Sequence, residues 1–288
     1  LFTILQANLL ELLSGSDEKK KSLSIKSITI ITLISLTSFA IGYKGRDFIR
    51  KNVYLPIGSS LRSDPDMPDI SQYKMSNCPE NPITIATFGQ SNSANYVRAK
   101  SDVVIPSNLY QYDWKSQSCY LYKEPLLGAS GTKGNVITYT AIKMANNSSK
   151  SIVIIPFGVG GTSVLEWAYG DLSHQHQIVM KRIKESGLSP MIFLWHQGES
   201  NAGGTAAEDY ARMLGEVVLG SREHAGYEIP WIVARVSFVP NGDPIKMGWI
   251  IEGQNTVIAD DPLTFPGPHT DDLNGTQWRY DTIHFNEA

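Results

Sequence analysis

The chain has 288 residues, enough for one large domain or two small ones with a sizeable core. Hydrophobic residues make up 42% and charged residues 18%, which excludes a disordered, collagen-like or disulfide-framework protein. Residues 1–51 hold eight Lys/Arg against four Asp/Glu, a net charge of +4, so the other 237 residues carry −7 of the total of −3. This acidic body argues against a nucleic-acid partner, because binding to phosphates requires a basic face.

Residues 27–43 form an uncharged run, and residues 1–26 precede it as an N-terminal tail that ends in a lysine cluster. A helix of this length spans about 25 Å, slightly short of a hydrocarbon core of about 30 Å, and flanking lysines can extend its reach. The run predicts a membrane-targeting segment, either a transmembrane signal anchor or a signal peptide. A buried amphipathic helix is the alternative, but the apolar residues do not lie on one face. Positive charges flank the run equally, so charge alone does not fix its orientation.

Residues 44–80 contain several Pro, Gly and Ser residues without helical or strand periodicity, so we expect a linker. A membrane-targeted chain would carry its globular part outside the cytoplasm, in the periplasm or at the cell surface. A disulfide between Cys78 and Cys119 is then one expectation, and two unrelated buried cysteines are the other. Neither cysteine lies in a Cys-x-x-Cys or Cys/His cluster, so we expect no structural zinc site.

Beyond residue 80, short apolar runs alternate with longer helical patterns. The apolar runs 83–88, 151–156, 190–195 and 230–236 predict buried strands, and the stretches 135–147, 172–186, 206–224 and 245–259 predict helices. Buried strands separated by helices are typical of a parallel sheet that is covered on both faces. We therefore expect residues 81–288 to form a three-layer α/β/α sandwich with a central parallel sheet.

Polar, glycine-containing loops follow three of the predicted strands. Their sequences are Gly89-Gln90-Ser91-Asn92-Ser93, Gly158-Val159-Gly160-Gly161-Thr162-Ser163 and His196-Gln197-Gly198-Glu199-Ser200-Asn201. The carboxyl ends of parallel strands meet at one edge of the sheet, and ligand sites of open α/β sheets lie there. The three loops therefore predict one functional site.

Ser91 lies between a predicted strand and a predicted helix, where unpaired N–H groups favour developing negative charge. This is a position for a nucleophile, although serine is equally a common helix N-cap. Because residue 93 is Ser, the sequence does not match the G-x-S-x-G nucleophile elbow of α/β-hydrolases.

The other two loops offer candidate hydrogen-bond donors and proton-transfer groups. Gly160 and Gly161 could aim a backbone N–H at an oxyanion, or could form a simple turn. The side-chain amide of Gln197 could donate a second hydrogen bond. His196 and Glu199 are candidates for general acid/base work, but we favour the interpretation that they brace their loop.

Asp281 and His284 stand close to the end of the chain. A spacing of three places both on the same side of a turn, so the carboxylate can reach Nδ1–H and leave Nε2 free to take a proton from a serine. A surface turn and half of a metal site are the alternatives. We expect two other histidines, His174 and His176, to be solvated on a predicted helix.

An aromatic-rich loop region is predicted before residue 125. Its members are Tyr110, Tyr112, Trp114, Tyr120 and Tyr122. They could stack on sugar rings, but ordinary packing is the favoured interpretation for most of them.

Taken in order, these blocks resemble the SGNH (GDSL-like) hydrolase superfamily, in particular its sialate O-acetylesterase/acetylxylan esterase branch. The matching blocks are Gly89-Gln90-Ser91-Asn92, Gly160-Gly161-Thr162-Ser163 with Trp167, Trp195-His196-Gln197-Gly198-Glu199-Ser200 and Asp281-Thr282-Ile283-His284, and the run from Pro125 to Gly131 is similar to that branch too. The resemblance covers about residues 81–288. It implies a flavodoxin-like fold that removes acetyl groups from carbohydrate without a metal or organic cofactor.

The resemblance also implies a role for each site residue. Ser91 would be the nucleophile, His284 the general base and Asp281 its orienting partner. An oxyanion hole would comprise the Ser91 N–H, an N–H of Gly160 or Gly161, and the Gln197 side chain. We expect Gln90, Asn92, His196 and Glu199 to support these groups from behind.

Three features depart from the family pattern. Gln197 stands where most of the superfamily has Asn, and Ser93 stands where Met is more usual. The chain ends four residues after His284, where the family continues into a final helix, so we expect the C-terminus to be truncated. An O-acetyltransferase with the same triad and a non-catalytic, membrane-tethered glycan-binding module remain the alternative functions.

Overall fold

The computed structural model of the chain describes residues 66–287. The predicted tail 1–26, the predicted membrane segment 27–43 and most of the predicted linker 44–80 lie outside the described residues. Among residues 66–287, no helix combines the length and the apolar character that a membrane crossing requires.

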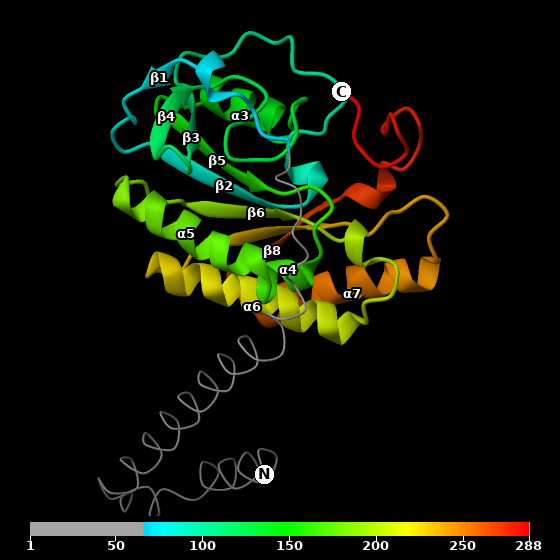
Figure 1. Cartoon of the computed structure of the whole chain (residues 1–288). Coiled ribbons are helices and arrows are strands. Elements are labelled where there is room, and N and C mark those ends of the chain that lie inside the picture. Colours follow the sequence, from blue (N-terminus) through cyan, green and yellow to red (C-terminus); the bar gives the residue numbers. More distant parts are fainter. Residues whose placement is uncertain (1–65, 288) are drawn as a thin grey trace, which may run out of the picture. The chain divides into compact units, whose positions relative to one another are not determined.

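An eight-stranded sheet forms the centre of the described fold, in the order β1-β4-β3-β5-β2-β6-β7-β8 (Figure 1). The strands are β1 (Met75–Ser76), β2 (Ile83–Gly89), β3 (Leu109–Asp113), β4 (Ser118–Leu121), β5 (Ile152–Gly158), β6 (Ile192–His196), β7 (Trp231–Arg235) and β8 (Thr264–His269). The six strands from β3 to β8 in this order run parallel, whereas β4 pairs antiparallel with β3 and with β1. The predicted α/β fold with a mainly parallel sheet is confirmed.

Helices lie on both faces of the sheet (Figure 1). They are α3 (Ile137–Asn146), α4 (Val164–Ala168), α5 (Asp171–Glu185), α6 (Ala207–Ala225) and α7 (Pro244–Asp260). Ile85 of β2 belongs to a buried cluster that it shares with α3. Phe88, three residues further along the same strand, points to the opposite face and contacts Trp167 of α4 and His176 of α5. Successive residues of one strand thus bury two different layers of helices.

The predicted linker extends too far along the chain. Met75 and Ser76 pair with β4, and Cys78 forms the expected disulfide with Cys119 of β4, with a Cα–Cα distance of 5.0 Å. The end of the 44–80 segment is therefore part of the sheet. A two-residue edge strand has no periodicity that a sequence pattern could reveal.

The predicted aromatic loop is a pair of strands, β3 and β4, with buried side chains. Tyr112, Trp114, Tyr120 and Tyr122 are each at most 8% exposed, so packing is their role. The expectation that His176 is solvated is wrong, because this side chain is 4% exposed and lies against Phe88. Its neighbour His174 is exposed as expected.

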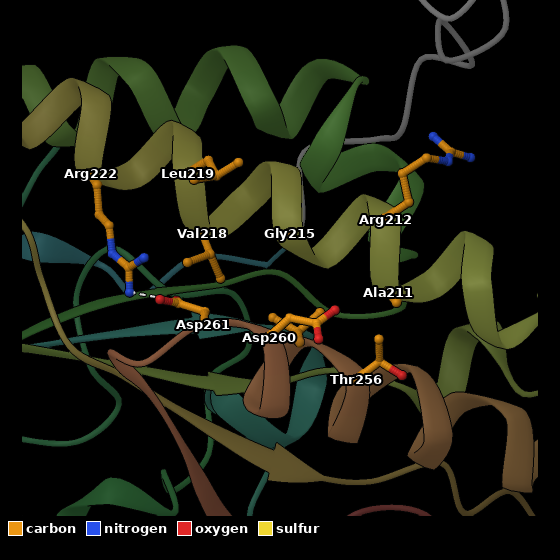
Figure 2. Close-up of a pocket in the computed structure, with 10 residues that line it drawn as sticks. Ala211, Arg212, Gly215, Val218, Leu219, Arg222, Thr256, Asp260 and Asp261 are labelled. Carbon is orange, nitrogen blue, oxygen red and sulfur yellow. Dashed lines mark ion pairs between the residues drawn. The ribbon is translucent and has the colours of Figure 1, made fainter. Parts of the chain in front are cut away.

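A groove of about 390 Å³ separates α6 from α7 (Figure 2). At one end of it the buried Arg222 places Nη2 2.7 Å from Oδ2 of Asp261. Burial by itself would raise the pKa of Asp261, but hydrogen bonds from Arg222 and Thr264 outweigh it and hold the pKa below its usual value. The groove contains none of the predicted site residues. The ion pair joins α6 to the C-cap residue of α7 and is a feature of helix packing.

Candidate active site

The sheet brings the three predicted loops together. Gly89, at the end of β2, is paired with Gly158 of β5 on one side and with His196 of β6 on the other. Gly89 has a φ of +129°, and a Cβ at this position would lie 2.1 Å from the carbonyl oxygen of His196. Only glycine allows so close an approach of the two strand ends.

Ser91 begins a single 3-10 turn, η4 (Ser91–Ser93), rather than the longer helix expected from the sequence. Gln90 is the N-cap residue, so the alternative of Ser91 as an N-cap is wrong. Two hydrogen bonds fix the turn to the end of the sheet. The Gln90 N–H donates to the carbonyl of His196 at 3.0 Å, and Ser93 Oγ donates to the carbonyl of Gln90 at 2.7 Å. As the first residue of a helical turn, Ser91 presents an N–H that has no acceptor within that turn.

The D-x-x-H pair predicted from spacing is present. Asp281 Oδ2 lies 2.7 Å from His284 Nδ1, and Oδ1 accepts the N–H groups of Ile283 at 3.1 Å and of His284 at 2.7 Å. Burial pushes the pKa of Asp281 upward, but the hydrogen bonds from His284 and Ile283 outweigh it and lower the pKa below its usual value. The carboxylate therefore stays ionised and holds Nδ1. Within residues 66–287 no group of three or more His, Cys, Asp or Glu side chains is arranged to hold a metal ion.

Ser91 and His284 line the same pocket, which has a volume of about 400 Å³. Gly160, Gly161 and Glu199 are part of the same wall. No hydrogen bond joins the two side chains of Ser91 and His284 in this part of the structure. Such bonds are often long in unliganded active sites and shorten when substrate binds, so a shared pocket is the relevant geometric condition.

Asn92 links the two halves of the site. Its Nδ2 donates to Glu199 Oε1 at 2.8 Å and to the carbonyl of Ile283 at 3.2 Å. The turn that carries Ser91 is thereby tied to the turn that carries His284, across 191 positions of sequence. Asn92 thus contacts both turns, and its supporting role in the reaction stays a prediction.

Gln197 does not have the role expected of it. Its Nε2 lies 2.6 Å from Asn201 Oδ1, 3.1 Å from the Thr162 carbonyl and 3.2 Å from Gln90 Oε1, and the residue is fully buried. An amide has only two N–H groups, so inward acceptors take both of them. Gln197 therefore connects the loops behind the pocket, and it does not line the pocket.

Gly160 departs from expectation in a similar way. Its N–H donates to Ser130 Oγ at 2.8 Å, so this donor is already engaged. Ser130 belongs to the run between Pro125 and Gly131 that is similar to the esterase branch, and its own N–H bonds the carbonyl of Gly158. The Gly160–Gly161 turn lines the pocket as predicted, but the Gly160 N–H does not point at an oxyanion.

His196 and Glu199 are both buried supports, as favoured from the sequence. Burial, with a smaller effect from the charge of Arg279, lowers the pKa of His196 to about 4, and its Nε2 lies 3.1 Å from Thr270 Oγ1. Burial raises the pKa of Glu199, although the hydrogen bond from Asn92 opposes the rise. Their burial and their hydrogen bonds to Thr270 and Asn92 tie the loop after β6 to neighbouring segments, which is the arrangement of a bracing role.

Arg279 is a buried support of the candidate site that the sequence did not indicate. The side chain is fully buried, and its guanidinium lies 5.1 Å from the ring centre of Phe238 and 4.5 Å from that of Phe285. Its nitrogens donate to the backbone carbonyls of Thr270, Leu273 and Ile283. Arg279 therefore fixes the loop that carries His284. A lone arginine in a loop gives no sequence signal for such a role.

Comparisons with known proteins agree with this fold. A protein from Arabidopsis thaliana with a crystal structure shares 21% identity, with a TM-score of 0.56 over 71% of this chain and 91% of that one. A carbohydrate acetylesterase from Xanthomonas citri shares 17% identity, with a TM-score of 0.51 over 67% of this chain and 50% of that one. No curated protein sequence matches the chain. The family model described as carbohydrate esterase, sialic acid-specific acetylesterase, matches residues 83–288, and the chain therefore belongs to this family.

Proposed function

We propose that this protein is a serine esterase that removes O-acetyl groups from carbohydrate, with Ser91 as nucleophile, His284 as general base and Asp281 as the group that orients His284. The observation that carries the proposal is the Asp281–His284 hydrogen bond of 2.7 Å beside a pocket that Ser91 also lines. Membership of the carbohydrate esterase family supports the class of substrate.

The reaction would proceed by acyl transfer in two steps. Ser91 Oγ attacks the acetyl carbonyl while His284 Nε2 takes the hydroxyl proton, and the resulting oxyanion is stabilised by the Ser91 N–H. His284 then returns the proton to the sugar oxygen as the ester bond breaks. Water attacks the acetyl-enzyme in the same way, which releases acetate and regenerates the serine. Asp281 stabilises the imidazolium in both steps.

The proposed site of action is outside the cytoplasm. The disulfide between Cys78 and Cys119 supports this location, because such bonds persist mainly in oxidising compartments. An acetylated glycan at the cell surface or in the periplasm would be the substrate.

The test is acetate release from acetylated xylan, acetylated sialic acids, bacterial exopolysaccharides and p-nitrophenyl acetate. Ser91→Ala should remove almost all turnover, and wild-type protein should label at Ser91 with a fluorophosphonate. Ser200→Ala is the matched control, because Ser200 lines the same pocket and takes no part in the proposed reaction. Near-normal hydrolysis by Ser91→Ala would refute the proposal.

A further inference from the structure

Two tyrosine rings flank the imidazole of His284. The Tyr96 ring is stacked on it at 5.2 Å between ring centres with 20° between the planes. The Tyr280 ring is stacked on it at 6.1 Å with an angle of 28°. Tyr280 stands only four positions before His284, whereas Tyr96 comes from a distant part of the chain, so the stacking of Tyr96 on His284 is a product of the fold.

A single hydrogen bond does not fix a ring. The bond from His284 to Asp281 holds Nδ1, but rotation about the bond to a flat ring is soft, and the His284 side chain is 19% exposed. Nε2 must nevertheless point at Ser91 for proton transfer. A neighbouring ring that lies parallel to the imidazole restricts the plane of the imidazole. The hydrogen bond to Asp281 does not supply this constraint.

Tyr96 is itself held on both sides. The Arg98 N–H donates to the carbonyl of Phe285 at 3.0 Å, which ties the segment after Tyr96 to the residue after His284. At its other end, the Tyr96 hydroxyl lies against the pocket wall, because a Cβ on Gly160 would be only 2.7 Å from it. Tyr96 also lines the pocket that Ser91 and His284 share.

We infer that Tyr96 is a positioning residue for the reaction: its ring holds the plane of His284 and stabilises the imidazolium that forms when Ser91 loses its proton. The inference rests on the proposed esterase function. Aromatic faces attract cations, so a stacked tyrosine favours the protonated ring in addition to orienting it.

Several charged or titratable groups lie near His284 and Tyr280. Asp281 contacts the imidazole directly and favours its charged form. Lys133 lies beside Tyr280: its Nζ is 4.5 Å from the Tyr280 ring centre and donates to the Tyr280 hydroxyl at 2.8 Å. Glu199 lines the pocket, and Arg279 donates to the carbonyl next to His284.

Removing the Tyr96 ring makes the imidazolium less stable, so the base stays unprotonated to a lower pH. The acidic limb of the pH–rate profile of Tyr96→Leu should therefore move to lower pH.

The experiment compares kcat, KM and the pH–rate profile on p-nitrophenyl acetate for the full chain and its Tyr96 variants. Tyr96→Leu should lower kcat by about two- to tenfold, more than it changes KM, while Tyr96→Phe keeps the ring and should retain wild-type kcat. Tyr139→Leu, at an exposed site of α3, is the control for loss of a tyrosine. Circular dichroism and thermal unfolding show that each variant is folded.

The inference is overturned if Tyr96→Leu keeps the kcat and acidic limb of the wild type, or if Tyr96→Phe loses as much as Tyr96→Leu, which would assign the effect to the hydroxyl. These outcomes require an active wild type. A wild-type chain that neither releases acetate nor labels with a fluorophosphonate would instead refute the proposed function.

Discussion

Acidification should destabilise the core beneath the site, and His176 of α5 should account for a defined part of the effect. The side chain is 4% exposed, lies 5.0 Å from the Phe88 ring, and its Nε2 has no hydrogen-bond partner among the described residues. Burial, with a smaller effect from the charge of His224, lowers the pKa of His176 to about 3. The folded protein therefore keeps this imidazole neutral well below neutral pH.

The sign and size of the effect follow from proton linkage. In the unfolded chain a histidine has its ordinary pKa of about 6.5, so below that pH the unfolded state binds a proton that the folded state refuses. The stability is intact above pH of about 6.5 and is lost as the pH falls toward the folded pKa of His176, about 3. At a pH of about 5 the unfolded state has gained about 2 kcal/mol from this one residue.

Urea unfolding at pH 7.5 and pH 5.0 measures the difference. Other groups that titrate in this window, such as His196 and Glu199, contribute equally to the wild type and to His176→Leu and cancel in the comparison. We expect the free energy of unfolding of the variant to fall by about 2 kcal/mol less than that of the wild type over this interval. His174→Leu removes an exposed histidine from the same helix and should behave like the wild type. Equal losses in the wild type and His176→Leu would refute the reasoning.

Three further predictions concern the edge of the sheet and the site. Reduction of the Cys78–Cys119 disulfide, which closes a sequence separation of 41, should lower the free energy of unfolding by about 4 kcal/mol, measured by urea unfolding with and without reductant. Asp281→Asn should lower kcat on p-nitrophenyl acetate on the order of 10³-fold or more, because His284 loses the carboxylate that fixes its tautomer, and a small effect would contradict the assigned triad. Arg279→Met should cost about 3 kcal/mol in thermal or urea unfolding, because three carbonyls lose their buried donor, and an unchanged stability would contradict its bracing role.

Two of the helices could be predicted closely from the sequence. The stretch 206–224 corresponds to α6 at Ala207–Ala225, and 245–259 corresponds to α7 at Pro244–Asp260. Local chemistry marks their ends, since Gly226 closes α6 with a φ of 82° and Asp243 caps α7 by accepting the Ile245 N–H. Such signals act within a few residues and need no knowledge of the rest of the fold.

The strands β3 and β8 could not be predicted, because their sequences lack a continuous apolar run. Pro266 and Pro268 interrupt β8, which is tolerated because this strand lies at the edge of the sheet. β3 contains Gln111, which is buried only because its amide finds the carbonyl of Lys123 and the N–H of Leu127. A polar residue that is satisfied by partners elsewhere in the chain has no apolar pattern to show.

Some features of the candidate site could also be predicted from the sequence, and others could not. Loops that follow strands could be placed at one edge, so Ser91 and the Gly160–Gly161 turn were expected near each other and both line the pocket. Spacing alone gave the Asp281–His284 contact. The direction of the Gln197 amide could not be read, because it depends on acceptors from three other segments.

Ser91 and His284 are held in place by different parts of the fold. Ser91 sits directly on the end of β2, where main-chain bonds of the sheet fix its turn. The turn of His284 lies after the last strand of the sheet. An isolated bridge pairs Arg279 with Phe285, the Tyr280 N–H donates to the His284 carbonyl at 3.1 Å, and side chains add to these main-chain bonds. Asn92 reaches it from the nucleophile turn and Arg279 from within the loop, and both donate to the same carbonyl, that of Ile283. Because both supports donate to this one acceptor, next to His284, their side chains reinforce the main-chain bonds that position the base.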